Sequence, residues 1–397
     1  MGLERGNSKY WRALAALFMG SFVEFALLYV TQPLLPALTK DFALSPSVVS
    51  LSVSLTTGAM ALALLPLAAV FNRLQRKPTM LAAMLGASLL AIASGCSPSF
   101  ELLLVCRALQ GMLMAAFPAA AMAYVNEEFE PSGVGLAMGI YIAGTSIGGL
   151  GGRLLVSLLS DFMSWRTALL VMGGFCLLLA ICFFWLLPKA QSRRSTAVKQ
   201  AGLMAALPSL LKTPGILPLY IVGFVALGSF VALYNYIGYV LLAAPYSFSQ
   251  SQVGAVFLLY LLGTVSSMVS GGQVDRCGPG PVLVAGLLMM LGGALFSLGT
   301  PLLFKLGGLG LFTCGFFTTH ATASGWVGRL CRGDKAQAAS LYLFFYYVGA
   351  SVIGTGSGIF LASAGWAGVI GVTALILSGA LWLAWRQQGL NRRTGVT

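Results

Sequence analysis

The sequence predicts an all-α membrane protein, with twelve transmembrane helices arranged as two pseudo-symmetric halves of six. Three observations predict this fold class. First, 58% of the 397 residues are apolar and only 8% are charged, whereas soluble domains carry about 25% charged residues. Second, apolar runs of about 20 residues, long enough to cross a hydrocarbon core about 30 Å thick, recur along the whole chain. Third, the two halves of the chain repeat one another's polar and small residues at a nearly constant offset.

Each predicted span is an apolar run bounded by a polar connection. In chain order the runs cover residues 13–35, 48–70, 79–97, 101–123, 134–157, 166–187, 216–242, 251–270, 281–303, 306–328, 337–361 and 366–386. Several contain Gly or Pro, which bundled membrane helices tolerate better than soluble helices do. The first run lacks a small-residue cleavage site, so we expect it to remain as an anchor.

The basic residues predict how the chain is oriented. When the connections are assigned to alternating sides, one side carries eighteen Lys and Arg and the other carries three: Lys40, Arg166 and Lys305. Basic loops stay in the cytoplasm, so both termini are expected there. This topology accounts for the net charge of +13, and a nucleic-acid-binding role would require a solvated basic domain that the sequence lacks. One connection, Asn-Glu-Glu-Phe-Glu at 126–130, carries no basic residue and departs from the pattern.

A basic segment with Ser and Thr, residues 188–215, divides the chain. We interpret it as a cytoplasmic linker between an N-terminal six-helix bundle (1–187) and a C-terminal one (216–397). The halves repeat at an offset of about 201–205 residues, which pairs Asn72-Arg73 with Asp275-Arg276, Leu28-Tyr29 with Leu233-Tyr234, Gly111 with Gly315, Tyr141 with Tyr342, and Gly148 with Gly349. Two parallel six-helix halves are a layout of secondary transporters, with the substrate site near the midplane.

Four motifs carry a resemblance to a known family. They are Asp275-Arg276-Cys277-Gly278 after Gly271, with the altered first-half counterpart Asn72 to Pro78; Arg107-Ala-Leu-Gln110-Gly111; the Gly-rich stretch 139–152, which lacks the Pro of the usual antiporter motif; and Trp165-Arg166. Over its whole length the chain resembles the major facilitator superfamily, and within it the drug:proton antiporter-1 group and the YnfM-type inner-membrane transporters. Residues 234–239 (YNYIGY) and 315–320 (GFFTTH) resemble the YnfM-type members specifically.

The resemblance implies that spans one, four, seven and ten line a central cavity, and each has a polar centre. We expect proton coupling from Glu24, Arg107 and His320. We expect substrate binding by six residues: Glu24, Gln110, Tyr234, Asn235, Phe316 and His320. An ionised carboxylate at the bilayer centre costs about 2.5–3.5 kcal/mol on insertion scales, so Glu24 requires water, a cationic partner or a proton.

Structural alternatives stand beside these roles. Glu24 is alternatively a protonated carboxyl that hydrogen-bonds a neighbouring helix for packing, and His320 a hydrogen-bonded packing residue. Arg107 is alternatively an ion-pair strut. Tyr234 and Asn235 are alternatively interfacial residues at the membrane surface. We expect Arg153 to snorkel from the outer end of span five towards Asp161.

The remaining motif residues are assigned to conformational control and packing. Asn72, Arg73, Arg76, Asp275 and Arg276 are expected to act in gating, because charged residues at helix boundaries can pair with a facing helix end. Asn72 lacks the charge of its counterpart, which predicts a weaker first-half contact. A second group, Gly139, Gly148, Gly149 and Gly152, is expected to let helices pack closely.

The sequence contains no phosphate-binding loop, nucleophile elbow or metal-ligand spacing, so we predict no enzyme, no cofactor and no metal site. The seven Cys lie mostly within spans without paired spacing. The predicted function is proton-coupled efflux of small amphipathic or cationic compounds by alternating access, carried out by a monomer of the bacterial inner membrane. The alternatives are an exporter or facilitator of a small metabolite such as a sugar or amino acid, and a non-transporting receptor or scaffold.

Overall fold

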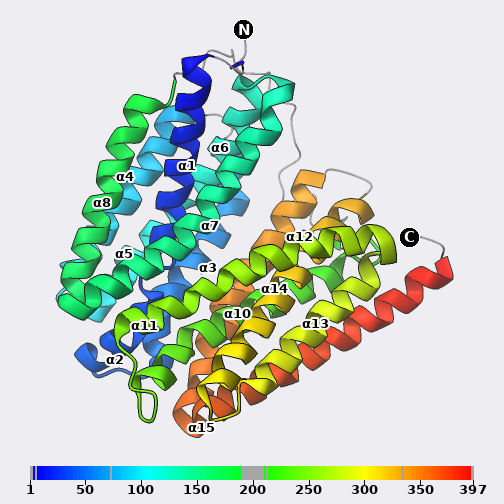
Figure 1. Ribbon diagram of the computed structural model, residues 1–397. Coiled ribbons are helices and arrows are strands. Elements are labelled where there is room, and N and C mark those ends of the chain that lie inside the picture. The colour runs from blue at the N-terminus through cyan, green and yellow to red at the C-terminus, as the bar shows by residue number, and fades with distance from the viewer. Residues whose placement is uncertain are drawn as a thin grey trace. The chain divides into compact units, whose positions relative to one another are not determined.

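The computed structural model describes residues 3–4, 7–71, 74–188, 210–211, 213–331 and 335–394. Its elements are helical (Figure 1). In the first half they are α1 (Ser8–Leu28), η1 (Gln32–Leu34), α2 (Leu35–Phe42), α3 (Pro46–Phe71), α4 (Arg76–Gly95), α5 (Phe100–Met114), α6 (Ala116–Glu128), α7 (Pro131–Phe162) and α8 (Trp165–Leu186). In the second half they are α10 (Ile216–Leu242), α11 (Gln250–Ala255), η2 (Val256–Leu259), α12 (Tyr260–Cys277), α13 (Pro279–Phe296), α14 (Leu302–Leu330) and α15 (Lys335–Thr394).

The expected membrane spans are present as helices. Eleven helical segments of the described residues are long and apolar enough to cross a bilayer. The last of them contains two of the predicted spans, because α15 loses helical geometry at Ala364 and Gly365 and continues as a second helix. Gly365 has a φ of +60°, which glycine adopts readily because it has no Cβ. The prediction of a twelve-helix membrane protein is therefore confirmed.

Three predicted spans are interrupted instead of continuous. Span one is divided between α1 and α2, span four between α5 and α6, and span eight between α11 and α12. Pro33 lies within the first interruption and Pro118 just after the second, and neither supplies a backbone N–H to the preceding turn, which weakens the helix there. In span eight the chain tightens into the 3-10 helix η2.

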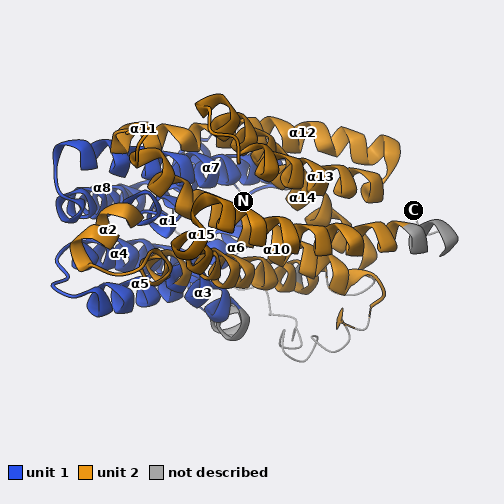
Figure 2. Ribbon diagram, turned by 90° about the horizontal axis from the view of Figure 1, so that it is seen from below, with its two compact units in different colours: residues 1–34, 55–202 blue, residues 35–54, 203–397 orange. Residues whose placement is uncertain are grey.

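The chain forms two compact units, coloured separately in Figure 2. Unit 1 contains residues 1–34 and 55–202, and unit 2 contains residues 35–54 and 203–397. In unit 1, α1 packs on α7 and α8, and α4 packs on α5, α6 and α8. In unit 2, α10 packs on α15, and α13 packs on α14 and α15. Span pairs one–five and three–four of the first half are thus repeated as seven–eleven and nine–ten of the second.

The repeat extends to single glycines. A Cβ atom on Gly148 of α7 would lie 2.3 Å from the Phe22 carbonyl oxygen of α1, and one on Gly349 of α15 would lie 2.0 Å from the Phe224 carbonyl oxygen of α10. Both glycines therefore let two helix backbones touch. These equivalent crossings show that the two halves use the same packing geometry.

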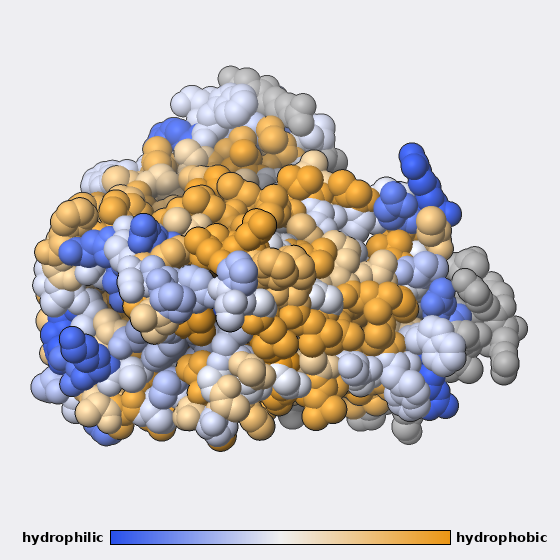
Figure 3. Space-filling view, turned by 60° about the horizontal axis from the view of Figure 1, so that its bottom comes forward, coloured by the Kyte–Doolittle hydropathy of each residue, from blue (hydrophilic) through white to orange (hydrophobic). Residues whose placement is uncertain are grey.

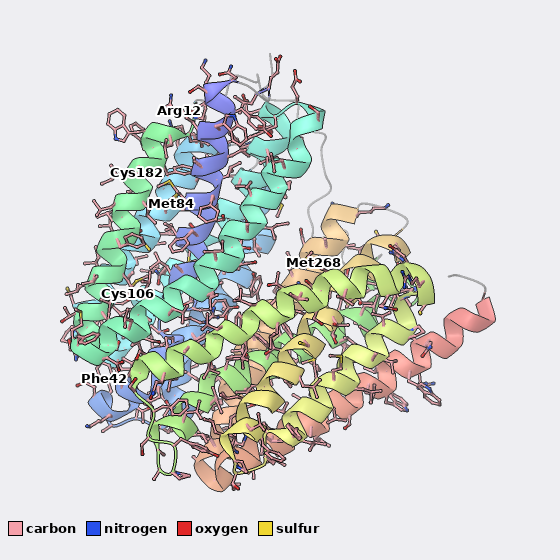
Figure 4. The ribbon with its side chains drawn as sticks, viewed as in Figure 1. Arg12, Phe42, Met84, Cys106, Cys182 and Met268 are labelled. Atoms are coloured by element: carbon pink, nitrogen blue, oxygen red, sulfur yellow. The ribbon has the colours of Figure 1, made fainter. Side chains whose placement is uncertain are left out.

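The outer surface of the helices is apolar. Large hydrophobic side chains such as Phe162 and Leu303 are 80% and 76% exposed, and apolar residues cover much of the face seen in Figure 3. Met268 projects outward from α12 (Figure 4). Contiguous apolar surface of this kind is typical of helices in contact with lipid.

Candidate functional site: the interrupted first span

The candidate site is built around the end of α1. The helix ends at Leu28, and residues 29–31 form a turn before η1 begins at Gln32. The last carbonyl groups of a helix have no donors within the helix, so other groups must satisfy them. In this protein the donor comes from span four.

Arg107 of α5 supplies that donor. Its fully buried guanidinium donates from Nη1 to the Leu27 carbonyl oxygen at 3.0 Å and from Nη2 to the Leu28 carbonyl oxygen at 2.7 Å. Nη1 also donates to Gln110 Oε1, and Gln110 Nε2 donates in turn to the Ala87 carbonyl oxygen of α4 at 2.8 Å. A cation at a helix C-terminus is stabilised by the helix dipole as well as by hydrogen bonds. Arg107 and Gln110 therefore fix the end of α1 to α4 and α5.

Glu24 lies one turn before the end of α1, and only 2% of its surface is exposed. Within the described part of the chain, neither Oε1 nor Oε2 has a hydrogen-bond partner. The side chain lies within electrostatic range of Tyr141 on α7 and Cys176 on α8. An ionised carboxylate in such a buried position is costly unless water or a counter-ion reaches it, which favours the protonated form. Arg107 is not a hydrogen-bond partner of either carboxyl oxygen.

The position of α1 beside Glu24 is set by α7. A Cβ on Gly152 would lie 2.6 Å from Ala26 Cα, which repeats one turn later the contact between Gly148 and Phe22. By contrast, nothing lies within 4 Å of a Cβ on Gly139, and the nearest atom to one on Gly149 is Arg153 Nη1 at 3.4 Å. The close approach expected for four glycines is thus seen at two of them.

Arg153 holds the other side of the interruption. Its Nε donates to Gln32 Oε1 at 2.7 Å, its Nη1 donates to the Gly149 carbonyl oxygen, and its guanidinium lies 4.2 Å from the centroid of the Tyr29 ring. The expectation that Arg153 snorkels to the outer surface was wrong, because the side chain is only 3% exposed. Gln32 and Tyr29 give the Arg153 guanidinium a hydrogen-bond acceptor and an aromatic ring inside the protein, so the side chain does not extend to the surface.

In unit 2, His320 is part of a stack of aromatic rings. Its Nδ1 lies 3.0 Å from Tyr342 Oη, and its ring centroid lies 4.5 Å from that of Tyr346. Phe316, one turn earlier on α14, is nearly parallel to His320 and stacks on Phe230 of α10 at 3.9 Å. His320 and Tyr346 are half-buried, whereas the other rings are buried. The hydrogen bond with Tyr342 orients the imidazole and leaves Nε2 for another partner.

Tyr234 and Asn235 are buried within α10. Tyr234 Oη forms a 2.8 Å hydrogen bond with Thr313 Oγ1 of α14, and its ring stacks on Phe257 at 5.3 Å. Both residues are buried inside unit 2. The structure therefore brings Tyr234, Asn235, Phe316 and His320 into one unit, and Glu24, Arg107 and Gln110 into the other.

Two of the five residues expected to act in gating, Arg76 and Asp275, each form an ion pair inside their own unit. Arg76 makes a two-point pair with Glu127, at 2.7 Å from Nη2 to Oε1 and 3.1 Å from Nε to Oε2. Asp275 and Arg329 lie 3.8 Å apart. Arg276 is exposed in the last turn of α12, and Asn72 and Arg73 lie outside the described residues.

Sequence reasoning missed Glu127, Arg329, Tyr342 and Gln32 as partners. A signal for the first pair was present: the acidic connection 126–130 is an exception among basic ones, and Glu127 precedes Arg329 by 202 residues, which is the repeat offset. One partner of each pair is therefore at an equivalent position with the opposite charge, whereas Asp275 corresponds to Asn72 and not to Arg76.

This combination of membrane-crossing helices, a repeated half and buried polar groups within spans defines a membrane transport protein. Residues 17–242 match the model of the Major Facilitator Superfamily. The chain is 41% identical over 382 residues to the uncharacterized MFS-type transporter YybF of Bacillus subtilis (strain 168), covering 96% of this chain and 95% of that one. It is 40% identical over 391 residues to the inner membrane transport protein YnfM of Escherichia coli (strain K12), covering 98% and 93%.

Solved structures show the same fold. A bacterial homologue of the human lysosomal transporter Spinster superposes with a TM-score of 0.79 at 14% identity, covering 96% of this chain and 97% of that one. The nucleoside transporter NupG superposes with a TM-score of 0.78 at 16% identity, covering 96% and 100%. The chain belongs to the Major Facilitator Superfamily. The resemblance predicted from the motifs is confirmed, and so is the prediction that the protein is not an enzyme.

Proposed function

We propose that this transporter exports small amphipathic or cationic compounds in exchange for protons, by alternating access. Glu24 is the leading proton-binding group, His320 is a second one, and Arg107 modulates the first through the end of α1. The substrate contacts are Glu24 and Gln110 in unit 1 and Tyr234, Asn235, Phe316 and His320 in unit 2. The protein is a monomer of the bacterial inner membrane, with both termini in the cytoplasm.

The observation that carries the proposal is the state of Glu24. A carboxyl kept for packing would hydrogen-bond a neighbouring helix, since an unmade bond in a buried site costs about 1–3 kcal/mol. Within the described residues Glu24 makes no such bond. A buried acid without partners is retained at a cost to stability, which is typical of a group whose protonation changes during function.

Substitution by Gln tests this role directly. E24Q has nearly the same shape as the protonated acid and cannot ionise, so we expect normal expression, unchanged or higher thermal stability, and loss of proton-driven transport. The matched control is E101Q, the same change at an exposed carboxylate in the first turn of α5. Proton-coupled transport by E24Q at the wild-type rate would leave Glu24 without a coupling role.

The assay uses an efflux-deficient bacterial strain that accumulates the fluorescent cation ethidium. Cells with the wild-type gene should accumulate less dye and grow in the presence of more toxic compounds of a panel than cells without it. A protonophore should abolish the difference. Efflux that persists in the presence of the protonophore would indicate a facilitator. If cells with and without the gene accumulate the same amount of every compound in the panel, the protein would be a scaffold.

A second candidate is export of a small metabolite. The superposition on a protein named as a nucleoside transporter favours this alternative, as does the absence of the Pro that the antiporter motif of span five normally carries. Including sugars, amino acids and nucleosides in the panel distinguishes the two functions, because a metabolite exporter would change their accumulation and leave ethidium unaffected.

A further inference from the structure

Four aromatic rings of unit 2 lie nearly parallel to one another. On α14, the rings of Phe316 and His320 are inclined by 8°, with their centroids 6.1 Å apart. Tyr346 of α15 lies 4.5 Å from His320 at 29° and 6.4 Å from Phe316 at 21°. Tyr342, one turn before Tyr346, is inclined to it by 25°. These four residues, which we call the aromatic face, thus give two helices one common ring orientation.

Two members of the aromatic face are accessible. His320 and Tyr346 are half-buried, whereas Phe316 and Tyr342 are 3% and 1% exposed. The buried rings therefore fix the orientation of the accessible ones. Offset-stacked aromatic pairs are favoured beyond the area that they bury. A flat ligand can extend the stack with its whole ring system, whereas a ligand with twisted rings can place only one ring parallel to it.

The imidazole of His320 has a defined tautomer. Nδ1 lies 3.0 Å from Tyr342 Oη, and that hydroxyl has no other hydrogen-bond partner among the described residues. A buried O–H without an acceptor is costly, so the hydroxyl donates to Nδ1. A neutral imidazole with an acceptor at Nδ1 carries its proton on Nε2. His320 therefore presents an N–H donor on the side away from Tyr342.

That donor is available to a ligand. Nε2 has no hydrogen-bond partner among the described residues. It also remains accessible, in contrast to the enclosed Thr319 hydroxyl beside it on α14. The acidic residues described in unit 2, Asp41 and Asp275, are exposed and lie near the ends of α2 and α12. The aromatic face is therefore suited to an uncharged group that accepts a hydrogen bond.

We propose that the aromatic face recognises the planar, fused aromatic part of an exported compound, and that His320 Nε2–H donates a hydrogen bond to a carbonyl oxygen or ring nitrogen on that part. Tyr346 is then a specificity-determining residue. Tyr342 is a positioning residue, because it keeps the imidazole proton on Nε2. The inference rests on the proposed function, since the ligand is the exported compound, and it adds the chemical class of that compound.

Three probes separate stacking from hydrogen bonding. Each carries the same trimethylammonium side arm, attached to fluorenone (planar, with a carbonyl), fluorene (planar, without one) or benzophenone (a carbonyl between twisted rings). Binding to the purified full chain is measured by calorimetry in detergent at about pH 8, where free histidine is neutral. The wild type should bind the fluorenone probe about three- to tenfold more tightly than the fluorene probe, because one hydrogen bond is gained. It should prefer fluorenone over benzophenone by a similar factor, because stacking is retained.

Four variants assign these preferences to side chains. H320F keeps a ring and removes the donor, so it should bind the fluorenone and fluorene probes equally and still disfavour benzophenone. Y346L removes a ring and should lose the preference for planar probes. Y342F should reduce the preference for fluorenone over fluorene and leave the planar preference unchanged. The matched control is F345L: Phe345 is also half-buried but stacks on Tyr220 at 5.4 Å, so both preferences should remain.

Equal binding of the three probes by the wild type, or no binding of any of them, would overturn the inference. Equal effects of Y346L and F345L on the planar preference would do so as well. The result is separate from the test of proton coupling. Transport by E24Q at the wild-type rate would remove the coupling role of Glu24 and leave the probe preferences standing, whereas equal binding of the probes would leave that coupling role standing.

Discussion

Replacing Gly148 by Ala is expected to destabilise the protein, whereas the same change at Gly139 is not. A Cβ on Gly148 would lie 2.3 Å from the Phe22 carbonyl oxygen and 2.6 Å from its Cα. The first distance is about 1 Å shorter than ordinary van der Waals contact, which begins at 3.4 Å. The obstructing atoms belong to the backbone of α1, so no rotamer change relieves the clash, and α1 and α7 must separate.

The magnitude follows from two opposing terms. Overpacking costs about 1–3 kcal/mol, and the rigid backbone contact puts G148A at the upper end of that range. Exchanging Gly for Ala within a helix recovers about 1 kcal/mol of helix propensity. The net loss in the free energy of unfolding is therefore about 2 kcal/mol. At Gly139 nothing lies within 4 Å of the new Cβ, so only the propensity gain remains.

The measurement is thermal unfolding of the purified variants in detergent, followed by tryptophan fluorescence. G148A should unfold at a lower temperature than the wild type, and G139A at the same or a higher temperature. The equivalent variant of the second half, G349A, should behave like G148A, because its Cβ would lie 2.0 Å from the Phe224 carbonyl oxygen. The explanation fails if G148A is as stable as the wild type, or if G139A loses as much stability as G148A.

Four further predictions concern polar contacts. R107M should lower the free energy of unfolding by about 2 kcal/mol, because it removes both hydrogen bonds from the guanidinium to the end of α1, although the Leu27 carbonyl keeps a weak bond from the Val30 N–H. R107K should retain part of that stability because it keeps the charge; denaturation curves of both variants check this. R76Q and E127Q should each cost about 1 kcal/mol, and the double variant should cost less than their sum, since both remove one pair. Y342F should lower transport without changing expression, because the imidazole on α14 loses the hydroxyl that orients it; a transport rate equal to the wild type would contradict this. Charge reversal of Asp275 should reduce transport and leave membrane insertion intact, as shown by comparing efflux with the amount of protein in membranes.

The number and order of the spans were predictable because hydrophobic length and basic connections are properties of the chain itself. The interruption of span one was not. The mean hydropathy of about 20 residues does not reveal a local break in a helix, and Pro33 and Pro36 lower that mean only slightly. Both prolines nevertheless follow the point at which α1 ends, so the backbone chemistry of proline was the better guide there.

The roles of single residues depended on which face of a helix they occupy. Gly148 and Gly152 are four residues apart and lie on the same face of α7, which is the face that meets α1. Gly149 is turned by about 100° from Gly148, and Gly139 meets no neighbour within 4 Å. The spacing was visible in the sequence, but the face that meets another helix was not.

Long-range partners were the least predictable part of the site. Arg107 bonds to carbonyls about 80 positions away, and nothing in the sequence indicates that its partners are backbone atoms. Arg153 was expected at the surface because an isolated arginine near a span end usually reaches water. It lies buried instead, because the chain turns at residues 29–31 and brings Gln32 and Tyr29 to it.

Glu24 and Arg107 make separate contacts at the end of α1. Had Arg107 formed an ion pair with Glu24, protonation of the carboxyl would have left a buried cation without compensation, and each proton transfer would have cost several kcal/mol. Arg107 instead bonds to the Leu27 and Leu28 carbonyl oxygens and to Gln110, all of which keep their partial charge at every stage of proton binding. Glu24 makes no hydrogen bond to the described residues, so the proposed proton exchange would break none of them. The anchoring of the end of α1 by Arg107 therefore does not depend on the protonation state that we propose to change at Glu24.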